Sequence, residues 1–438
     1  MIVVVGIGAG GWDEIPVRHQ QLIRGSAVLL GGKRHLDLVP DVPGQRREPW
    51  PSPLREGLPA LLDSLPGDAP VVVLASGDPL VSGVGTTLIS LLGRENVRIE
   101  PAVSSVALAR ARMGWAAESC VAVSLVGRDV SLVARELAPG RRILALSSDG
   151  STPRQIADLL VTTGFGASTL AVLGDLGAET ESARTASASA WVGESPRLNI
   201  VAIECVADRV GLDTLAGARG STSASSVEGH FVQASEPLGE GVSRPTQSLP
   251  ASWAAGLPDD AFEHDGQLTK RDLRASALAR LAPVPGQHLW DVGAGAGSVG
   301  IEWMRSHPTC TTTAIEASPE RAARIARNAS RLGVPGLTVV DGRAPDALAD
   351  LPAPDAIFIG GGATRPGVLD ACLRALRPGG RLVVHGVTLE TEQVLARQHA
   401  ERGGELTRIS VESVDSIGTF RGWAPQRTVV QWAFQPAE

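Results

Sequence analysis

Apolar residues in the first half of the chain gather in short runs, and segments with helical spacing separate several of these runs. Such runs predict buried strands when turn residues bound them, and apolar positions three or four residues apart predict amphipathic helices. Strand-like runs occupy residues 2–5, 27–30, 71–75, 97–99, 121–125, 143–146, 169–173 and 198–203. Helical spacing covers residues 84–92, 105–111 and 156–163. The alternation predicts an α/β fold with mainly parallel sheets, arranged as two sub-domains with a cleft between them.

This pattern breaks between residues 210 and 254. The serine-rich run 221–226 and the Pro/Ser/Gly-rich stretch 235–252 have no sustained apolar periodicity, which predicts a flexible linker. A chain of 438 residues is also too long for one ordinary domain. We therefore expect an N-terminal domain over residues 1–209, a linker over residues 210–254 and a C-terminal domain over residues 255–438.

A second α/β series fills the C-terminal domain. Its strand-like runs are residues 287–292, 311–315, 337–340, 356–359, 381–385, 406–411 and 428–434. Its helical segments are residues 270–281, 299–306, 319–332, 366–376 and 389–402. The helix over 319–332 is well marked, because Ser318 can cap it, Pro319 suits its first turn and Gly333 can end it. The series predicts a doubly wound, Rossmann-like sheet whose last two strands form a hairpin-like pair.

Charge and composition narrow the function classes. A formal net charge of −7 argues against a general nucleic-acid or anionic membrane surface. There is no apolar run of about 18 residues and no basic segment at the start, so we expect a cytoplasmic protein without a membrane-spanning helix. The cysteines Cys120, Cys205, Cys310 and Cys372 stand far apart, which predicts small buried residues and no metal site.

One glycine-rich turn dominates the C-terminal domain. Asp291 ends an apolar strand, and Gly293, Gly295, Gly297 and Gly300 follow it before a helix. The spacing fits dinucleotide binding, but a carboxylate at this place suits a cationic amino-acid end better than a pyrophosphate.

The next two strands extend this ligand pattern. Glu316 ends the second strand, where an acid can accept ribose hydroxyls, and residues 339–344 end the third, where adenine would lie. Together these features fit S-adenosylmethionine better than NAD. NAD binding and a glycine turn kept only for helix packing remain the alternatives.

Residues 256–438 resemble the class I methyltransferases, and in particular the decarboxylating precorrin methyltransferases of cobalamin biosynthesis. The similar segments are residues 256–262, 265–270, 289–297 and 357–362. The resemblance implies cofactor contacts at Thr269, Asp291, Gly293, Ala294, Gly295, Ala296, Gly297 and Glu316, and in the segment after the third strand. Related enzymes often have aspartate where Arg343 stands, so we expect the backbone around Ala344 to contact adenine.

The N-terminal half begins with a similar glycine run. Residues 2–5 lead into Gly6-Ile7-Gly8-Ala9-Gly10-Gly11. The second strand ends in Gly31-Gly32-Lys33-Arg34 without an acid, so NAD would lack a ribose partner. NADP could still use the basic pair.

Two later turns in this half favour another ligand. They are Gly77-Asp78-Pro79 and Val103-Ser104-Ser105, each following a strand. With the run 31–35 they resemble the tetrapyrrole methylase family (class III methyltransferases), and in particular its precorrin carbon-5 methylases. The resemblance implies that Gly77, Asp78, Pro79, Val103, Ser104 and Ser105 hold S-adenosylmethionine between two sub-domains, and that Gly8 and Gly10 face the macrocycle. In the alternative interpretation, Asp78 and Ser104 only cap helices.

Together the halves resemble the fused precorrin-6Y C5,15-methyltransferases (decarboxylating). The resemblance implies methyl transfer to carbons 5 and 15 of the macrocycle, loss of carbon dioxide from the acetate at carbon 12, and one S-adenosylmethionine site in each domain. It assigns carbon 5 to the N-terminal domain and the other two steps to the C-terminal domain. An NADP-dependent reductase fused to one methyltransferase, and a non-catalytic tetrapyrrole sensor in the N-terminal half, are the rival functions.

A precorrin carries many carboxylates, so basic residues are expected to bind it. Lys33 and Lys270 are the only lysines among 40 basic residues, which is a weak indication of a compact charge at a site, with an ordinary surface lysine as the alternative. The candidate substrate contacts are Gly8, Gly10, Lys33, Arg34, Arg271, Arg274, Gly361 and Gly362. The candidate catalytic groups are Lys270, His264 and His385, with surface charge or structural histidine as the alternative. We also expect a homo-oligomer.

Overall fold

The computed structural model describes residues 1–66, 69–208 and 253–436, and almost all of the linker expected at residues 210–254 lies outside these ranges. Within the described ranges the chain divides into two compact units. The first unit contains residues 1–130 and 139–208, and the second contains residues 131–138 and 253–436.

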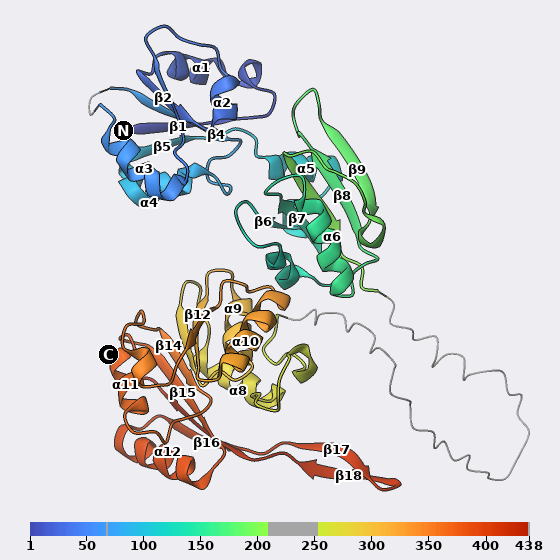
Figure 1. Cartoon of the computed structure of the whole chain (residues 1–438), viewed down its shortest axis with the longest axis vertical. Coiled ribbons are helices and arrows are strands. Elements are labelled where there is room, and N and C mark those ends of the chain that lie inside the picture. Colours follow the sequence, from blue (N-terminus) through green and yellow to red (C-terminus); the bar gives the residue numbers. More distant parts are fainter. Residues whose placement is uncertain (67–68, 209–252, 437–438) are drawn as a thin grey trace, which may run out of the picture. The chain divides into compact units, whose positions relative to one another are not determined.

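A parallel sheet in the order β3-β2-β4-β1-β5 builds the first sub-domain of the first unit (Figure 1). Its strands are β1 (Ile2–Ile7), β2 (Val28–Gly31), β3 (Arg46–Pro49), β4 (Val71–Ser76) and β5 (Val97–Glu100). Its helices are α1 (Val17–Arg24), α2 (Lys33–Asp37), α3 (Leu54–Asp63) and α4 (Val84–Leu92). Val4 and Val73 pack with residues of α3 and α4, whereas Val5 and Leu74 pack with residues of α1 and α2. Because neighbouring residues of a strand point to opposite faces, helices cover both faces of this sheet.

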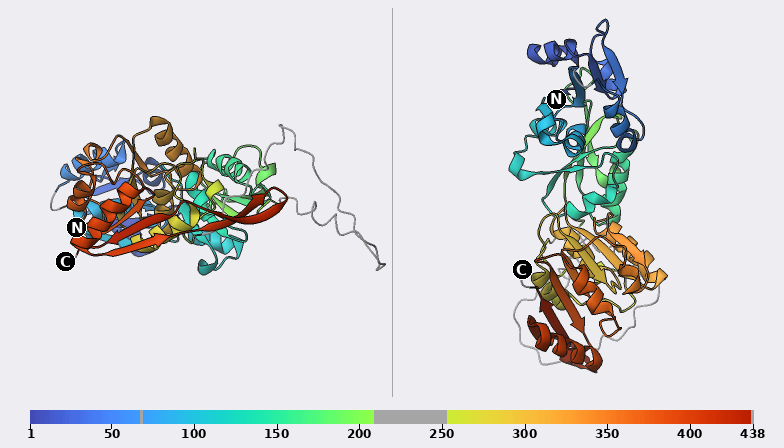
Figure 2. Two further views of the ribbon diagram at one scale, coloured as in Figure 1. Left: turned by 90° about the horizontal axis from the view of Figure 1, so that it is seen from below. Right: turned by 90° about the vertical axis from the view of Figure 1, so that its left-hand side faces the viewer.

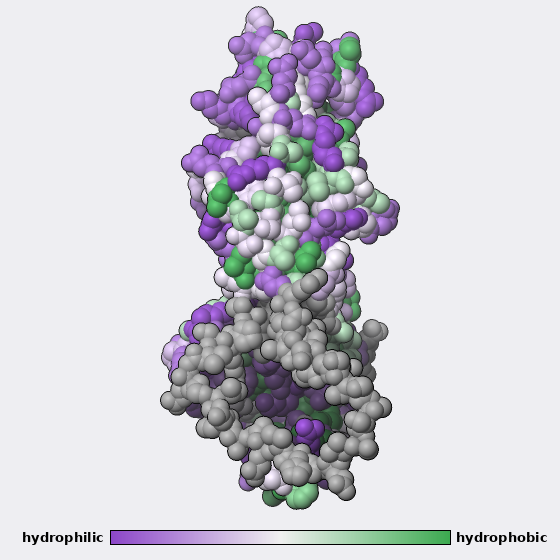
Figure 3. Space-filling model, turned by 90° about the vertical axis from the view of Figure 1, so that its right-hand side faces the viewer, coloured by the Kyte–Doolittle hydropathy of each residue, from purple (hydrophilic) through white to green (hydrophobic). Residues whose placement is uncertain are grey.

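A mixed sheet in the order β6-β7-β10-β8-β9 builds the second sub-domain. Its elements are β6 (Val121–Ser124), β7 (Arg142–Leu146), β8 (Thr169–Gly174), β9 (Ser182–Ser187), β10 (Asn199–Glu204), α5 (Ser105–Met113) and α6 (Thr152–Thr162). Strands β6 and β7 are parallel, whereas the β7–β10, β10–β8 and β8–β9 pairs are antiparallel. The expectation of mainly parallel sheets is therefore wrong for this sheet. The face of the first unit in Figure 3 is largely hydrophilic, with hydrophobic residues scattered over it.

A seven-stranded sheet in the order β13-β12-β11-β14-β15-β19-β16 forms the centre of the second unit. Its strands are β11 (His288–Val292), β12 (Thr311–Glu316), β13 (Thr338–Asp341), β14 (Ala356–Ile359), β15 (Arg381–Gly386), β16 (Glu405–Ile409) and β19 (Val429–Phe434). Strands β11 to β15 are parallel, and β19 is antiparallel to both of its neighbours. The doubly wound sheet with a late antiparallel pair is confirmed.

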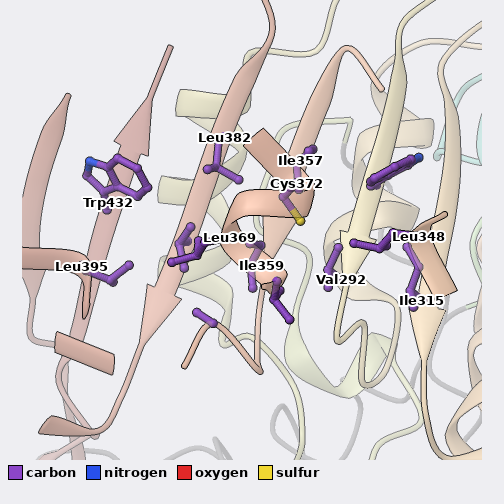
Figure 4. Packing of buried hydrophobic residues seen from close by; sticks show 14 of the residues in the cluster. Val292, Ile315, Leu348, Ile357, Ile359, Leu369, Cys372, Leu382, Leu395 and Trp432 are labelled. Carbon is purple, nitrogen blue, oxygen red and sulfur yellow. The ribbon is translucent and has the colours of Figure 1, made fainter. Parts of the chain in front are cut away.

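Helices cover both faces of this sheet. They are α8 (Arg271–Leu281), α9 (Ser298–Ser306), α10 (Pro319–Arg331), α11 (Val368–Ala375) and α12 (Leu389–Arg402). Figure 4 shows Leu369 and Cys372 of α11 near the strand residues Ile357 and Leu382, and Leu395 of α12 near Trp432, all within one buried cluster. The expected start of α10 is confirmed, since the Ser318 hydroxyl accepts a hydrogen bond from Arg321 N.

A two-stranded ribbon extends the second unit. Strands β17 (Glu412–Ile417) and β18 (Phe420–Pro425) pair with each other, in a sheet separate from the central one. Figures 1 and 2 show the ribbon running outward from the body of the unit. Every residue of β17 is exposed, including the apolar Val414 and Ile417.

Candidate active sites

Three turns meet at the carboxyl edge of the first parallel sheet. Gly77 N donates a hydrogen bond to Ile7 O (3.0 Å), and Ala102 N donates to Gly77 O (3.1 Å). A Cβ at Gly6 would lie 1.9 Å from Gly77 O, and one at Gly77 would lie 2.9 Å from Val103 O. Glycine is therefore required where these backbones touch. The fold brings together the turns predicted to hold the cofactor in this half.

The polar side chains of these turns also have local partners. The Asp78 carboxylate accepts a hydrogen bond from Leu80 N (2.9 Å), and the Ser104 hydroxyl accepts one from Ala107 N (3.2 Å) at the start of α5. Val103 between them is 61% exposed. Ser82, in the loop that continues from Pro79, has a φ of 56°, a strained value of the kind that collects at functional sites.

The first glycine run lies at the same edge and packs against an acid. A Cβ at Gly10 would lie 2.1 Å from Glu14 Cδ, and one at Gly8 would lie 3.4 Å from Glu14 Oε2. Glu14 itself is exposed. The loop is thus narrow and bears a carboxylate, which the sequence analysis did not assign to any site.

Basic residues follow β2 at this edge. Lys33 and Arg34 are exposed at the start of α2, and Arg34 reaches both His35 and Ser76. Burial lowers the pKa of Arg34, and the negative charge of Asp175 acts against that decrease. Asp175 has a φ of 47°, another strained non-glycine residue. Arg34 therefore interacts with an acid from the second sub-domain of the same unit.

In the second unit, the glycine turn between β11 and α9 has the left-handed backbone that its sequence requires. Gly293, Gly295 and Gly297 have φ values of 70°, 60° and 75°, a region that strongly favours glycine. Asp291 is fully buried, and its Oδ2 accepts a hydrogen bond from Gly300 N (2.9 Å), which fixes α9 to the strand. Burial raises the pKa of Asp291 to about 7.

Glu316 lies beside this turn at the end of β12. Its Oε2 accepts a hydrogen bond from Gly295 N (2.9 Å), and its Oε1 accepts one from Ser318 N (3.0 Å). Gly342 N donates to Glu316 O (3.0 Å), so the start of the segment with Arg343 and Ala344 is adjacent. The side chain of Arg343 is exposed. The structure thus brings the predicted ribose acid and the predicted adenine segment to one edge of the sheet.

The segment of residues 256–270, which we name the strap, covers the glycine turn. A Cβ at Gly295 would lie 2.9 Å from Gln267 O. Asp265 of the strap pairs with Arg321 (2.9 Å) and Arg324 (3.2 Å) of α10. The hydrogen bond from Arg321 holds the pKa of Asp265 well below its usual range. These ion pairs hold the strap, which includes Thr269, on α10. Sequence spacing alone did not indicate them.

The assignment of Arg274 as a substrate contact needs correction. Its side chain is completely buried and pairs with Glu302, which also accepts hydrogen bonds from Gly256 N and Leu257 N. The guanidinium further donates to the carbonyl oxygens of Leu257 and Thr269. Arg274 therefore locks the strap to α9 and has no donor directed at a ligand.

His385 also lies in the interior. It is 7% exposed, packs edge-on against Phe358, and its Nε2 is hydrogen-bonded to the Gln431 side chain (2.8 Å). Burial lowers its pKa to about 4, so it is neutral at neutral pH. Because His385 is buried and its Nε2 is bonded to Gln431, the structure favours a structural histidine over a proton donor at this position.

The other candidates stay predictions. His264 is exposed, and its Nδ1 accepts a hydrogen bond from Gly266 N (3.1 Å). Lys270 is 43% exposed with its Nζ 3.6 Å from Asp259, and Arg271 is exposed beside it. Gly361 lies against the cofactor turn, since a Cβ at Gly293 would meet Gly361 O at 3.0 Å, and Gly362 follows with a φ of 84°.

Other features of the described residues bear on the remaining predictions. Cys205, Cys310 and Cys372 are buried, and Cys120 is half-buried. In the described ranges, no group of three or more His, Cys, Asp or Glu side chains is placed to hold a metal ion. No helix in those ranges has the length and hydropathy to span a bilayer.

Comparison with known proteins identifies both halves. The tetrapyrrole (corrin/porphyrin) methylase family matches residues 1–190, and the precorrin methyltransferase domain matches residues 260–436. The precorrin-6Y C(5,15)-methyltransferase [decarboxylating] of Sinorhizobium sp is 44% identical over 434 residues, which cover 99% of this chain and 96% of that protein.

Shorter relatives match part of the chain. Cobalt-precorrin-7 C(5)-methyltransferase of Salmonella typhimurium is 35% identical over 41% of this chain and 88% of its own length. Cobalt-precorrin-6B C(15)-methyltransferase (decarboxylating) of the same organism is 31% identical over 39% of this chain and 90% of its own length. The full-length match decides the family: the chain belongs to the precorrin-6Y C(5,15)-methyltransferases (decarboxylating).

Proposed function

We propose that this chain methylates precorrin-6Y at carbons 5 and 15 and removes carbon dioxide from the acetate at carbon 12. The observation that carries the proposal is the full-length match to a protein named for this reaction, together with separate single-step relatives of part length. We assign carbon 5 to residues 1–209, and carbon 15 and decarboxylation to residues 255–438, because the two family matches fall within those ranges.

The second unit has a donor set that fits S-adenosylmethionine. The Glu316 carboxylate can accept ribose hydroxyls, and the N–H groups at the start of α9 lie beside it. The left-handed Gly293, Gly295 and Gly297 leave room where side chains would project. Thr269 on the strap, Ala294, Ala296 and the backbone at Ala344 complete the proposed contacts. When bound, S-adenosylmethionine supplies an activated methyl group.

The first unit has a different cradle for a second molecule of the same cofactor. This cradle consists of two turns, Gly77-Asp78-Pro79 and Val103-Ser104-Ser105. Their backbones are in contact, and there is no room for a larger residue at Gly6 or Gly77. The N–H groups at the start of α5 lie beside these turns. We therefore propose one cofactor site in each unit, built from unrelated folds.

The residues of both sites act mainly by holding the reactants in line. A macrocycle with an electron-rich carbon is itself the nucleophile, and alignment of two reactants can contribute roughly 7–11 kcal/mol to lowering a barrier. The conjugated ring also accepts the electron pair that the departing carboxylate leaves behind. We propose that four basic residues bind substrate carboxylates: Lys33, Arg34, Lys270 and Arg271. We also propose that four glycines let the ring approach the backbone: Gly8, Gly10, Gly361 and Gly362.

Mass spectrometry of an incubation with precorrin-6Y and S-adenosylmethionine tests the reaction. We expect a product that has gained two methyl groups and lost one carbon dioxide. A product with one methyl group and all of its carboxylates would contradict the assignment of the second unit. Equilibrium dialysis should find two S-adenosylmethionine molecules per chain, and NADPH binding by the first unit would favour the reductase alternative instead.

We also propose that the chain self-associates through the β17–β18 ribbon. Its apolar residues Val414, Ile417, Phe420 and Trp423 are between 55% and 78% exposed. A lone two-stranded ribbon is marginally stable in water, and its open edges invite further strands. Light scattering should show an oligomer for the native chain and a smaller species for the double variant Phe420→Ser/Trp423→Ser. An unchanged mass would contradict this interface.

A further inference from the structure

A polar cluster at the carboxyl edge of the first sheet joins Arg34, proposed above to bind substrate carboxylates, to His35 and Ser76, which the contacts above do not use. His35, on α2, places its Nε2 2.9 Å from the Ser76 hydroxyl and 2.9 Å from Arg34 Nη2. Ser76 is the last residue of β4 and lies beside Ile7 of β1. The residue after it is Gly77, the first of the turn proposed to hold the cofactor. The cluster is therefore next to that proposed site.

The contacts of His35 define where its proton is. Arginine only donates, so Nε2 is the unprotonated nitrogen, and Arg34 and the Ser76 hydroxyl share its single lone pair, each at 2.9 Å. Nδ1 then carries the hydrogen. It is buried without a hydrogen-bond partner, and a Cβ at Gly32 would lie 3.3 Å from it. The imidazole is thus held against Gly32, with its lone pair facing both Ser76 and Arg34.

The charge on the ring agrees with this assignment. Burial, and then the positive charge of Arg34, lower the pKa of His35 to about 4. Asp175 in turn acts on Arg34 from the second sub-domain. At neutral pH the imidazole is consequently neutral, with Nε2 unprotonated, and it readily releases a proton that it has taken up.

Methylation of a ring carbon that bears hydrogen needs such an acceptor. Carbon 5 forms a bond to the methyl carbon as the bond from that methyl group to sulfur breaks, which leaves both hydrogen and methyl on carbon 5. Loss of the hydrogen as a proton returns the C–H electron pair to the conjugated ring. A base must receive this proton, and general-base catalysis typically contributes 10²–10⁴-fold to a rate.

We propose that Ser76 and His35 form the proton-accepting pair for methylation at carbon 5. The Ser76 oxygen takes the proton from carbon 5 while its own hydroxyl proton passes to His35 Nε2. The imidazolium then releases its proton to water, since burial and Arg34 both disfavour the charged ring. The proposal rests on the carbon-5 function assigned to the first unit. Its main rival as acceptor is Glu14, the exposed carboxylate beside Gly8 and Gly10.

The test uses the full chain with His35→Gln, which can still accept from Arg34 but cannot carry a proton. Ser76→Ala and Ser76→Thr remove and restore the hydroxyl, and Asp37→Asn is a control on an exposed residue of the same helix. Carbon-5 methylation should slow by about 10²–10⁴-fold in His35→Gln and Ser76→Ala. Ser76→Thr and Asp37→Asn should stay near the native rate. Cofactor affinity, decarboxylation and carbon-15 methylation should not change in any variant.

A substrate with deuterium at its ring-bridging carbons supplies a readout that a structural role would not alter. If proton removal has become slow, His35→Gln should show a larger primary isotope effect than the native chain. Native rates in both His35→Gln and Ser76→Ala would overturn the proposal. So would loss of cofactor binding in His35→Gln, or a loss of rate found in Glu14→Gln instead. If the native chain itself does not methylate carbon 5, the proposed function fails instead of the pair.

Discussion

Replacing Arg274 with alanine should destabilise the second unit and leave the first unit unchanged. The side chain of Arg274 has no exposed surface, and that of its partner Glu302 is 3% exposed. Removing one member of such a pair leaves a buried charge without compensation, which typically costs 3–5 kcal/mol. The substitution also leaves the carbonyl oxygens of Leu257 and Thr269 without this donor.

This magnitude can be converted into a melting temperature. For a unit of roughly 150–250 residues, 1 kcal/mol shifts Tm by about 2–4 °C. We therefore expect the thermal transition of the second unit to fall by roughly 6–20 °C. Because Arg274 holds the strap that carries Thr269, the cofactor affinity of this unit should fall as well.

Scanning calorimetry of the full chain with and without S-adenosylmethionine measures both effects. The double variant Arg274→Met/Glu302→Leu removes both charges and should recover part of the lost stability, since Glu302 is no longer a buried charge without Arg274. The recovery should be incomplete, because Gly256 N and Leu257 N lose their acceptor. Arg271→Ala, at an exposed neighbouring position, is the stability control. A Tm within about 2 °C of the native value for Arg274→Ala would refute the reasoning that this pair locks the strap.

Three further substitutions test other contacts. Glu316→Gln should weaken cofactor binding in the second unit by about 10–100-fold, because hydrogen bonds to a charged group contribute about 1.5–3 kcal/mol. Calorimetric titration measures the affinity, and Glu320→Gln is the control. Gly6→Ala places a methyl group 1.9 Å from Gly77 O and should lower the free energy of unfolding of the first unit by about 3 kcal/mol, measured by denaturant titration. Gly166→Ala is the control, because its methyl group would meet the nearest atom at 3.4 Å and should leave the stability nearly unchanged. Asp291→Asn should remove a pH dependence of the free energy of unfolding of the second unit. Burial raises the pKa of Asp291 to about 7, so between pH about 4 and 7 the folded unit holds a proton that the unfolded chain has released. The stability of the native unit should therefore fall across this window as pH rises. Parallel curves for native and Asp291→Asn chains would contradict that assignment.

The sequence predicted the central strands because their burial leaves a clear apolar signal. Strands β3 (Arg46–Pro49) and β9 (Ser182–Ser187) were missed, since both are edge strands made largely of polar or small residues. Strand direction in the second sheet was predicted wrongly, because a short buried run has the same appearance whether its neighbours are parallel or antiparallel. The β17–β18 ribbon was missed for a related reason: its apolar residues face water and contribute to no core.

The candidate sites divide along similar lines. Asp291 and Glu316 could be singled out because each ends a strand at a fixed distance from the glycine turn. The strap could not be placed, since its ion pairs join residues far apart in sequence, such as Asp265 and Arg321. Arg274 was misassigned because a formal charge does not distinguish a buried partner of Glu302 from a free cation. Ser76 was overlooked because a hydroxyl carries little signal until the fold places it beside His35.

The internal hydrogen bonds of Glu316 have a consequence for ligand binding. The carboxylate already has two donors, Gly295 N on one oxygen and Ser318 N on the other, and each oxygen keeps a second lone pair. The backbone thus fixes the direction of both oxygens before a ligand arrives. Less side-chain ordering is then needed on binding, which favours affinity at the place where we propose that a ribose binds.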